Sequence, residues 1–271
     1  KHTIRVCHEV LTSIARVGLQ VWRGAFLLAD FIIHCRHSIQ SKTIFEFGCG
    51  TGILGSILDL CGHTGGAFLT DYSDEIVALA ARNIDERSRS AVQQEFRKEA
   101  SSGIKARVLD WASGDNPRVS LPLHQSFLKN PTRVWTEEDV SRLSTEGSNV
   151  LFLAADVIYD DDLTRALFLK ASQIMKPGEC MWLALEKRYN FSMADNALVA
   201  NGYRLFQEHV HARPDDENNE ERLSFSDYYV YDSPFYTGKV VFKGSKMPIN
   251  FPQRVFDYDR IQDLELWQIE L

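Results

Sequence analysis

The chain alternates short, β-rich apolar runs with stretches in which apolar residues recur at helical spacing. The β-rich runs predict five strands, at 42–48, 65–71, 104–111, 148–159 and 180–188. The stretches between them predict three helices, at 51–62, 73–87 and 161–175. Strands and helices in this order are typical of an α/β fold built on a mostly parallel sheet.

Three further segments extend this framework. Residues 18–32 carry apolar side chains at Val21, Phe26, Leu27 and Phe31, and this spacing predicts a helix laid against the sheet. Two later segments predict a sixth strand and a closing strand, at 202–211 and 264–271.

Two stretches interrupt the alternation and are expected to be loop insertions. Residues 112–147 hold prolines and charges, with one short helix predicted at 136–143. A loop of that length in a compact domain is usually either functional or disordered. Residues 213–222 are acidic and polar, which indicates a solvated loop or a lip that attracts a basic substrate. The whole chain, 1–271, is otherwise expected to form a single domain with residues 1–17 as an N-terminal extension.

Charge and composition narrow the possible partners. The formal net charge of −7 disfavours nucleic acid as the main partner and suits a basic protein segment. Five scattered cysteines without a C-x-x-C pair indicate reduced thiols in an intracellular compartment. No run approaches the roughly 18 apolar residues of a membrane span, since the best candidate, 24–35, is short and carries Asp30.

The most informative stretch is FEFGCGTG, which runs from Phe45 to Gly52. It places three glycines after the first expected strand and before a helix, so that backbone N–H groups and a positive helix end meet a ligand at the carboxyl edge of the sheet. The spacing G-x-G-x-G puts Ile53 where a dinucleotide fingerprint has its third glycine, and no lysine follows as in a Walker loop. A nucleotide without a pyrophosphate is therefore indicated.

Residues at the ends of the next strands fit the same ligand. Asp71 ends the second expected strand, where a carboxylate can accept hydrogen bonds from ribose hydroxyls. The third strand ends in Asp110 and Trp111, an acid and an aromatic ring that suit an adenine. Together with the glycines, these residues predict a site for an adenosine.

Taken in order, the glycine loop, Asp71, Asp110-Trp111 and the apolar fourth strand resemble class I, seven-β-strand S-adenosylmethionine-dependent methyltransferases. The helix at 18–32 and the motif Asp156-x-x-Tyr159 after the fourth strand resemble, within that class, the family 16 methyltransferase-like protein-lysine methyltransferases. The resemblance implies a Rossmann-like, seven-stranded, mostly parallel sheet with helices on both faces and an antiparallel last strand. It also implies S-adenosyl-L-methionine as cofactor, with S-adenosyl-L-homocysteine as product.

The resemblance assigns roles to individual residues as well. With Glu46, which precedes the glycines, counted among them, the expected cofactor-binding residues are Trp22, Glu46, Gly48, Cys49, Gly50, Asp71, Trp111 and Ala155. Cys49 stands where the family more often has alanine or another small residue, a departure that should leave binding intact.

Asp156 and Tyr159 are expected to be the catalytic residues that face the methyl acceptor. A sulfonium leaves as a neutral group, so the reaction needs no acid but does need a neutral amine, and a lysine starts near a pKa of about 10.4. A dry pocket lowers that pKa. Asp156 would orient the amine rather than act as a general base, and Tyr159 would offer its ring face to the ammonium. Glu186 and Lys187 end the fifth strand and either shape the acceptor channel or mark ordinary strand-end polarity.

Simpler roles stay open for three of these residues. Asp156 could cap the next helix, and Tyr159 and Trp22 could be core packing. Histidines and cysteines at 34–37 and 61–63 suggest zinc, but their spacings match no standard site and no metal is expected.

The leading prediction is a monomeric S-adenosylmethionine-dependent methyltransferase that acts on a lysine side chain of a non-histone protein, through a basic segment of that protein. Two alternatives stay open: a class I methyltransferase acting on a small molecule or nucleic acid, and a cofactor-binding adaptor without turnover. The motif after the fourth strand lacks the N-P-P-Y type that favours a base amine, so direct nucleic-acid binding is not expected. Because no apolar run is long enough to span a membrane, no membrane partner is expected either. A location in the nucleus, the cytoplasm or both is implied by the resemblance alone.

Overall fold

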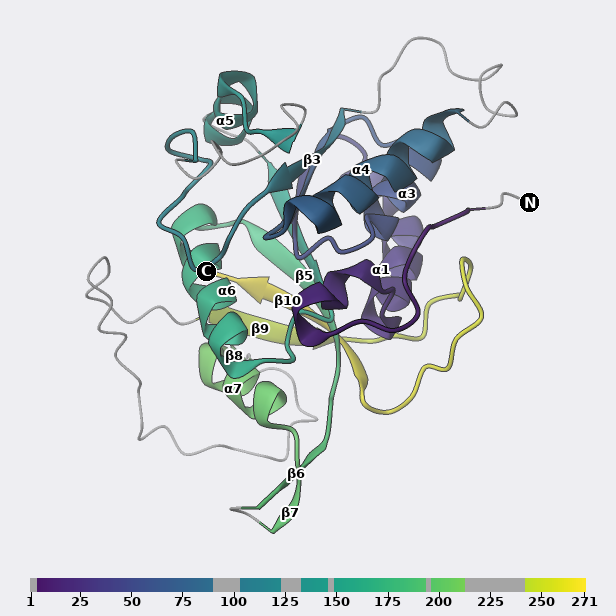
Figure 1. The fold of residues 1–271 in the computed structure, drawn as a ribbon, viewed down its shortest axis with the longest axis vertical. Coiled ribbons are helices and arrows are strands. Elements are labelled where there is room, and N and C mark those ends of the chain that lie inside the picture. Colours follow the sequence, from purple (N-terminus) through teal and green to yellow (C-terminus); the bar gives the residue numbers. More distant parts are fainter. Residues whose placement is uncertain (1–3, 90–102, 123–132, 146–148, 194–195, 213–241) are drawn as a thin grey trace.

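The computed structural model describes residues 4–89, 103–122, 133–145, 149–193, 196–212 and 242–271. Its centre is an eight-stranded sheet with the strand order β3-β2-β1-β4-β5-β10-β9-β8 (Figure 1). Its strands are β1 Thr43–Phe47, β2 Ala67–Asp71, β3 Ile104–Val108, β4 Val150–Ala155, β5 Cys180–Glu186, β8 Val210–Ala212, β9 Phe242–Met247 and β10 Leu264–Glu270. Only β10 among these eight runs against its neighbours, β5 and β9.

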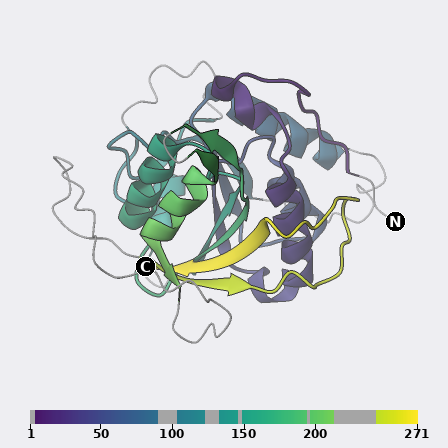
Figure 2. The ribbon, with the colours of Figure 1, turned by 90° about the horizontal axis from the view of Figure 1, so that it is seen from below.

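Helices cover both faces of this sheet (Figure 2). One face packs against α1 Arg23–His34, α3 Ile53–Leu60 and α4 Asp74–Arg89. The other packs against α5 Glu137–Ser144, α6 Asp161–Ile174 and α7 Asn201–His209. The remaining elements are η1 Ile14–Leu19, α2 Arg36–Ile39 and the hairpin of β6 Asn190–Ser192 with β7 Ala197–Val199, which projects from the body (Figure 1).

The two cores follow from the alternation of side chains along the buried strands. In β1, Ile44 joins the cluster under α1 and α3, whereas Phe45 and Phe47 join the cluster under α6. Successive residues of a strand point to opposite faces, and parallel sheets are covered on both. The second core is rich in aromatic rings, with the Phe45 centroid 5.5 Å from that of Phe152. These cores hold the strand ends, and therefore the site, in place.

The predicted α/β fold with a mostly parallel sheet and an antiparallel last strand is confirmed, but the predicted count of seven strands is one too low. Residues 202–211, expected to be a strand, form most of α7 and only the first part of β8. Leu205 and Phe206 are both buried, and a buried adjacent pair followed by Val210 fits a helical face rather than alternation. The strand of this sheet that the sequence did not predict, β9, has the sequence FKGSKM, which carries no apolar run.

The expectation that no segment approaches a membrane span needs a correction, because Ile14–His34 is long and apolar enough to cross a membrane by length and composition. In the fold it is divided into the 3₁₀ helix η1 and the helix α1, with residues 20–22 between them. Eight of the twelve residues of α1 are buried. The segment is thus a core helix preceded by a short turn.

The described parts of the 112–147 insertion are packed against the body of the protein. Trp135 is 2% exposed, and its Nε1 donates a hydrogen bond to the Val108 carbonyl at 2.8 Å. Arg118 donates to both carboxylate oxygens of Glu179, at 2.5 and 2.6 Å. The predicted helix at 136–143 is confirmed as α5, which begins with a capping box between Thr136 and Asp139. The acidic run 213–222 lies outside the described residues.

Asp30, in the middle of α1, fixes the segment that leads into β10. It is fully buried, and Oδ1 accepts hydrogen bonds from the backbone N–H groups of Arg254 at 2.7 Å and Val255 at 3.0 Å. Oδ2 accepts from the Tyr258 hydroxyl and from Arg260, each at 3.0 Å. A buried charge needs such partners, and here they connect α1 to a segment more than 220 residues away.

Candidate active site

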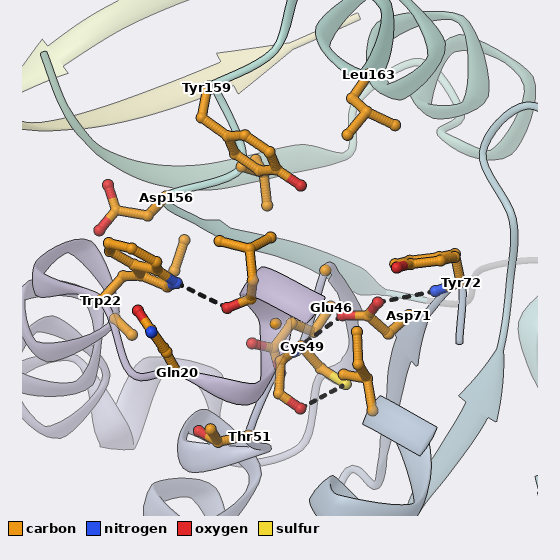
Figure 3. A pocket seen from close by; sticks show the side chains of 18 of the residues that line it. Gln20, Trp22, Glu46, Cys49, Thr51, Asp71, Tyr72, Asp156, Tyr159 and Leu163 are labelled. Atoms are coloured by element: carbon orange, nitrogen blue, oxygen red, sulfur yellow. Dashed lines mark hydrogen bonds between the residues drawn. The ribbon is translucent and has the colours of Figure 1, made fainter. Parts of the chain in front are cut away.

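A cavity of about 230 Å³ opens at the carboxyl ends of β1, β2 and β4, beside the N-terminus of α1 (Figure 3). All ten residues predicted for the site line it: Trp22, Glu46, Gly48, Cys49, Gly50, Asp71, Trp111, Ala155, Asp156 and Tyr159. They come from five separate stretches of sequence and meet because parallel strands end at the same edge of the sheet.

The three glycines form a loop that no other residue type would leave in this shape. Gly48, Gly50 and Gly52 have φ values of 67°, 50° and 73°, in the left-handed region that favours glycine. A Cβ on Gly48 would lie 2.7 Å from the Val157 side chain, and one on Gly50 would lie 3.0 Å from the Gly18 carbonyl. The bare backbone therefore forms the floor of the cavity and lets a ligand approach it closely.

Two buried carboxyl groups lie under this loop. Asp71 accepts hydrogen bonds from the backbone N–H groups of Gly50 at 3.0 Å and Tyr72 at 2.9 Å. Burial still raises the pKa of Asp71 to about 6, against the opposing effect of those two donors. Burial, reinforced by the Asp71 charge, raises the pKa of Glu46 well above its usual range. Two buried carboxyl groups in one cavity favour a ligand that brings positive charge or hydrogen-bond donors.

Unpaired polar atoms indicate where such a ligand would bind. Among the described residues, three buried side-chain polar atoms have no hydrogen-bond partner, and two of them line this cavity: Oε2 of Glu46 and Nε1 of Trp111. The Glu46 oxygen can accept a hydrogen bond and the Trp111 nitrogen can donate one, yet neither has a partner, although buried polar atoms are normally paired. S-adenosylmethionine carries an ammonium group, a sulfonium and an adenine, so its chemistry fits this set.

Asp156 sits at the corner after β4 with a φ of 53°. Its Oδ2 accepts the backbone N–H of Gly24 at 2.5 Å and its Oδ1 accepts that of Glu186 at 2.9 Å. Gly24 is in the first turn of α1, so Asp156 caps that helix and not the following one, whose N-cap is Asp160. Burial raises the pKa of the Asp156 carboxyl despite these donors. The side chain ties three elements together at the rim of the cavity.

Tyr159 lies across the cavity from the glycine loop, with Leu163 beside it (Figure 3). The side chain is half-buried, and burial together with the Asp71 charge raises the pKa of Tyr159 to about 12. The hydroxyl therefore keeps its proton at neutral pH and can donate a hydrogen bond, but cannot serve as a base.

Trp22 and the two residues at the end of β5 have distinct places. Trp22 precedes the first residue of α1, is half-buried, and donates from Nε1 to the Val17 carbonyl at 3.1 Å. Glu186 accepts from Arg23 at 2.5 Å on the outer side of the same corner. Lys187, predicted as a possible part of an acceptor channel, instead pairs with Glu265 at 3.0 Å and lines neither this cavity nor the neighbouring one.

Sequence reasoning missed one whole wall of the cavity. Residues from η1 and the following turn line it, among them Gln20, and so do Thr51 and Tyr72 from the loops after β1 and β2 (Figure 3). The Tyr72 hydroxyl donates to the Ala15 carbonyl and so ties η1 across the opening. A 3₁₀ turn has no lasting periodicity, and the position of Tyr72 directly after Asp71 was the one available signal.

The predicted absence of metal concerns a different part of the molecule. The histidines and cysteines at 34–37 and 61–63 do not join into a metal-binding group, and the described residues hold no cluster of three or more potential ligands. None of the five cysteines, all of which lie among the described residues, forms a disulfide.

The chain is similar to several known proteins. Residues 1–125 match the family model described as lysine methyltransferase. Over 98% of its length the chain is 30% identical to methyltransferase-like protein 22 of both Mus musculus and Homo sapiens, covering 58% and 57% of those proteins. Among solved structures, the O-methyltransferase TomG from Streptomyces achromogenes, in complex with S-adenosylmethionine, is 11% identical with a TM-score of 0.42, covering 93% of this chain and 81% of that one.

The sequence matches show that the chain is similar to methyltransferases, and its cavity has polar groups that would suit S-adenosylmethionine. More particularly, residues 1–125 are similar to the lysine methyltransferase family, and the chain as a whole is similar to methyltransferase-like protein 22. It spans a little over half the length of those relatives, so the activity of the whole protein is a matter for proposal.

Proposed function

We propose that this protein transfers a methyl group from S-adenosylmethionine to a lysine side chain of a non-histone protein. The observation that carries the proposal is the meeting, in one cavity, of the glycine loop, two buried acids and the Asp156-x-x-Tyr159 corner. A cavity for the cofactor alone would not need the last of these. The match of residues 1–125 to the lysine methyltransferase family model supports the choice of acceptor.

Residues on one side of the cavity would hold the cofactor. The glycine loop would lie along it, Asp71 would accept from the ribose hydroxyls, and Glu46 would accept from its ammonium group. Trp111 would donate from Nε1 and cover the adenine. The cofactor supplies the electrophilic methyl group on sulfur, and the protein supplies the position in which that methyl faces the acceptor.

Residues at the Asp156 corner would prepare the amine. A lysine must lose its proton before it can attack, and entry into a cavity walled by Trp22, Val157 and Leu163 disfavours its charged form. The protonated Tyr159 hydroxyl can donate a hydrogen bond to the amine of the acceptor lysine or to the backbone carbonyl of that lysine. Asp156 acts chiefly by holding α1, β4 and β5 in register, because both of its oxygens already accept backbone N–H groups. We therefore assign it a positioning role.

The test is a radiolabelled methyl-transfer assay on whole-cell lysate with wild type, Asp71→Ala and Tyr159→Phe. Protein bands should label with wild type, should be lost with Asp71→Ala, and should weaken about tenfold with Tyr159→Phe. Tyr189→Phe removes an exposed hydroxyl outside the cavity and should leave labelling unchanged.

Cofactor binding, measured by calorimetry with S-adenosylhomocysteine, separates the possible failures. Binding that is weak in Asp71→Ala but unchanged in Tyr159→Phe would assign the two residues to cofactor and acceptor respectively. Wild type that binds the cofactor but labels no protein would contradict the proposal, and label that disappears with nuclease but survives protease would move the acceptor to nucleic acid.

A further inference from the structure

A second, open cavity of about 550 Å³ adjoins the cofactor cavity at the outer side of the α1 corner. The two cavities share the side chains of Val21 and Trp22 as a common wall. The rest of the second cavity is lined by charged and aromatic residues from α1, the end of β5 and the segment before β10: Arg23, Phe26, Glu186, Arg188, Tyr258 and Asp259. We call these eight residues the outer groove.

One cation already occupies the aromatic face in the outer groove. The guanidinium carbon of Arg188 lies over the Trp22 ring, 4.4 Å from its centroid. This is a cation–π contact at close range, and tryptophan is the strongest of the aromatic side chains in such contacts. The same charge is near enough to Asp156 and Tyr159 to lower the pKa of each against the effect of burial. Arg188 thus marks a place that attracts a cation within reach of the acceptor corner.

On either side of the Trp22–Arg188 contact, the outer groove has aromatic rings and carboxylates that could bind a polypeptide. Phe26 and Tyr258 offer half-buried rings that lie 5.7 Å apart between centroids, and Glu186 and Asp259 offer carboxylates, one of them paired with Arg23. Both walls are rigid: Asp156 caps α1, and Asp30 fixes the segment that carries Tyr258. A groove between two fixed elements can hold an extended chain.

We infer that the outer groove binds the polypeptide on either side of the acceptor lysine, with Trp22 as the face on which the lysine cation is received and Arg188 as a built-in competitor that the lysine must displace. The inference rests on the proposed function. It changes one part of the sequence-based prediction, because it gives the cation-receiving face to Trp22, whereas Tyr159 keeps the hydrogen-bonding role.

The test uses a fluorescein-labelled peptide of alternating lysine and glycine, with its binding followed by fluorescence anisotropy in the presence of S-adenosylhomocysteine. Removing the competitor should help: Arg188→Ala should bind the peptide about fivefold more tightly than wild type. Adding Trp22→Leu to Arg188→Ala should abolish that gain, because the face for the cation is then gone.

Two controls separate a stacking site from simple repulsion between positive charges. Arg36→Ala removes an exposed arginine on α2, away from the groove, and should leave the affinity unchanged. A peptide with norleucine in place of lysine should gain nothing from Arg188→Ala. An unchanged or weaker affinity in Arg188→Ala, or a gain that persists in the Trp22→Leu double variant, would overturn the inference.

The lysate assay is independent of these measurements. If wild type labels protein but the peptide pattern fails, the proposed function stands and the groove does not bind the acceptor. If the peptide pattern holds but no protein is labelled, the groove is a lysine-binding surface and the proposed transfer is wrong.

Discussion

The ionised carboxylates of Asp71 and Glu46 destabilise the ligand-free fold, because both groups are buried in the cofactor cavity. Burial raises the pKa of both, so each is harder to ionise in the folded chain than in the unfolded one. A raised carboxyl pKa means that the ligand-free protein loses stability as the pH rises from about 4 to about 6, where the buried Asp71 must give up its proton. A cationic ligand that binds the ionised pair offsets that loss.

Cofactor binding should therefore depend on pH through Asp71. Only the ionised carboxylate accepts both ribose hydroxyls, so affinity for S-adenosylhomocysteine should be steady above about pH 6.5 and fall up to about tenfold per unit below pH 6. Calorimetry across this range measures the effect. In Asp71→Asn the affinity at neutral pH should be lower and the slope shallower, and an equal slope in both proteins would contradict the assignment.

At the scale of single residues, sequence reasoning works where function is tied to a strand end. Asp71 and Trp111 could be placed because the carboxyl ends of neighbouring parallel strands must meet. The partners of Asp156 could not, since Gly24 lies 132 positions away and nothing local indicates that a carboxylate after β4 caps a helix near the N-terminus. The stack of Arg188 on Trp22 is hidden for the same reason.

Among the elements, α1 connects the most parts of the molecule. Its N-terminus borders both cavities through Trp22, and its first turn donates the Gly24 N–H to the Asp156 carboxylate. Its middle holds the segment before β10 through Asp30. One core helix thus positions the cofactor side, the acceptor corner and the far wall of the outer groove.

Removing the Asp30 carboxylate should destabilise the protein strongly. Asp30→Ala leaves Arg260 without its ion-pair partner and two backbone N–H groups without acceptors, a loss of about 3 kcal/mol in the free energy of unfolding. Urea unfolding followed by circular dichroism measures it. Asp257→Ala, an exposed acid of the same segment, should change the value by less than about 0.5 kcal/mol; similar values for both variants would show that Asp30 is not an anchor.

The strand β9 and the helix α7, which the sequence did not predict, show where pattern reasoning stops at this scale. β9, with the sequence FKGSKM, shows no regular alternation of apolar and polar residues and forms by pairing with β10 and β8, contacts between segments that no local pattern reveals. α7 carries its apolar residues in one short cluster, and a nine-residue helix shows too few turns for its period to stand out from alternation. The strands β1, β2, β4 and β5, which lie inside the sheet, and the edge strand β3 were predictable from their apolar runs.

The whole molecule carries a net charge of −7, which bears on how a basic substrate approaches. If the acceptor segment is basic, raising the salt from about 0.05 M to about 0.3 M should raise its KM several-fold, because the Debye length shrinks below about 10 Å. Affinity for S-adenosylhomocysteine, whose contacts are buried, should change by less than about twofold over that range. Steady-state kinetics with a protein identified from a labelled band measure the KM, and calorimetry measures the affinity for S-adenosylhomocysteine. An equal salt effect on both quantities would argue against steering by charge.

The Asp30 anchor also makes the C-terminal segment a reporter of what happens at the cofactor cavity some distance away. Backbone N–H groups exchange with solvent deuterium only when their hydrogen bonds open, and those of Arg254 and Val255 open only when α1 releases them. A ligand that stabilises the start of α1 should make such release rarer. Hydrogen–deuterium exchange at the Arg254 and Val255 amides, which lie outside both cavities, should therefore slow when the cofactor binds.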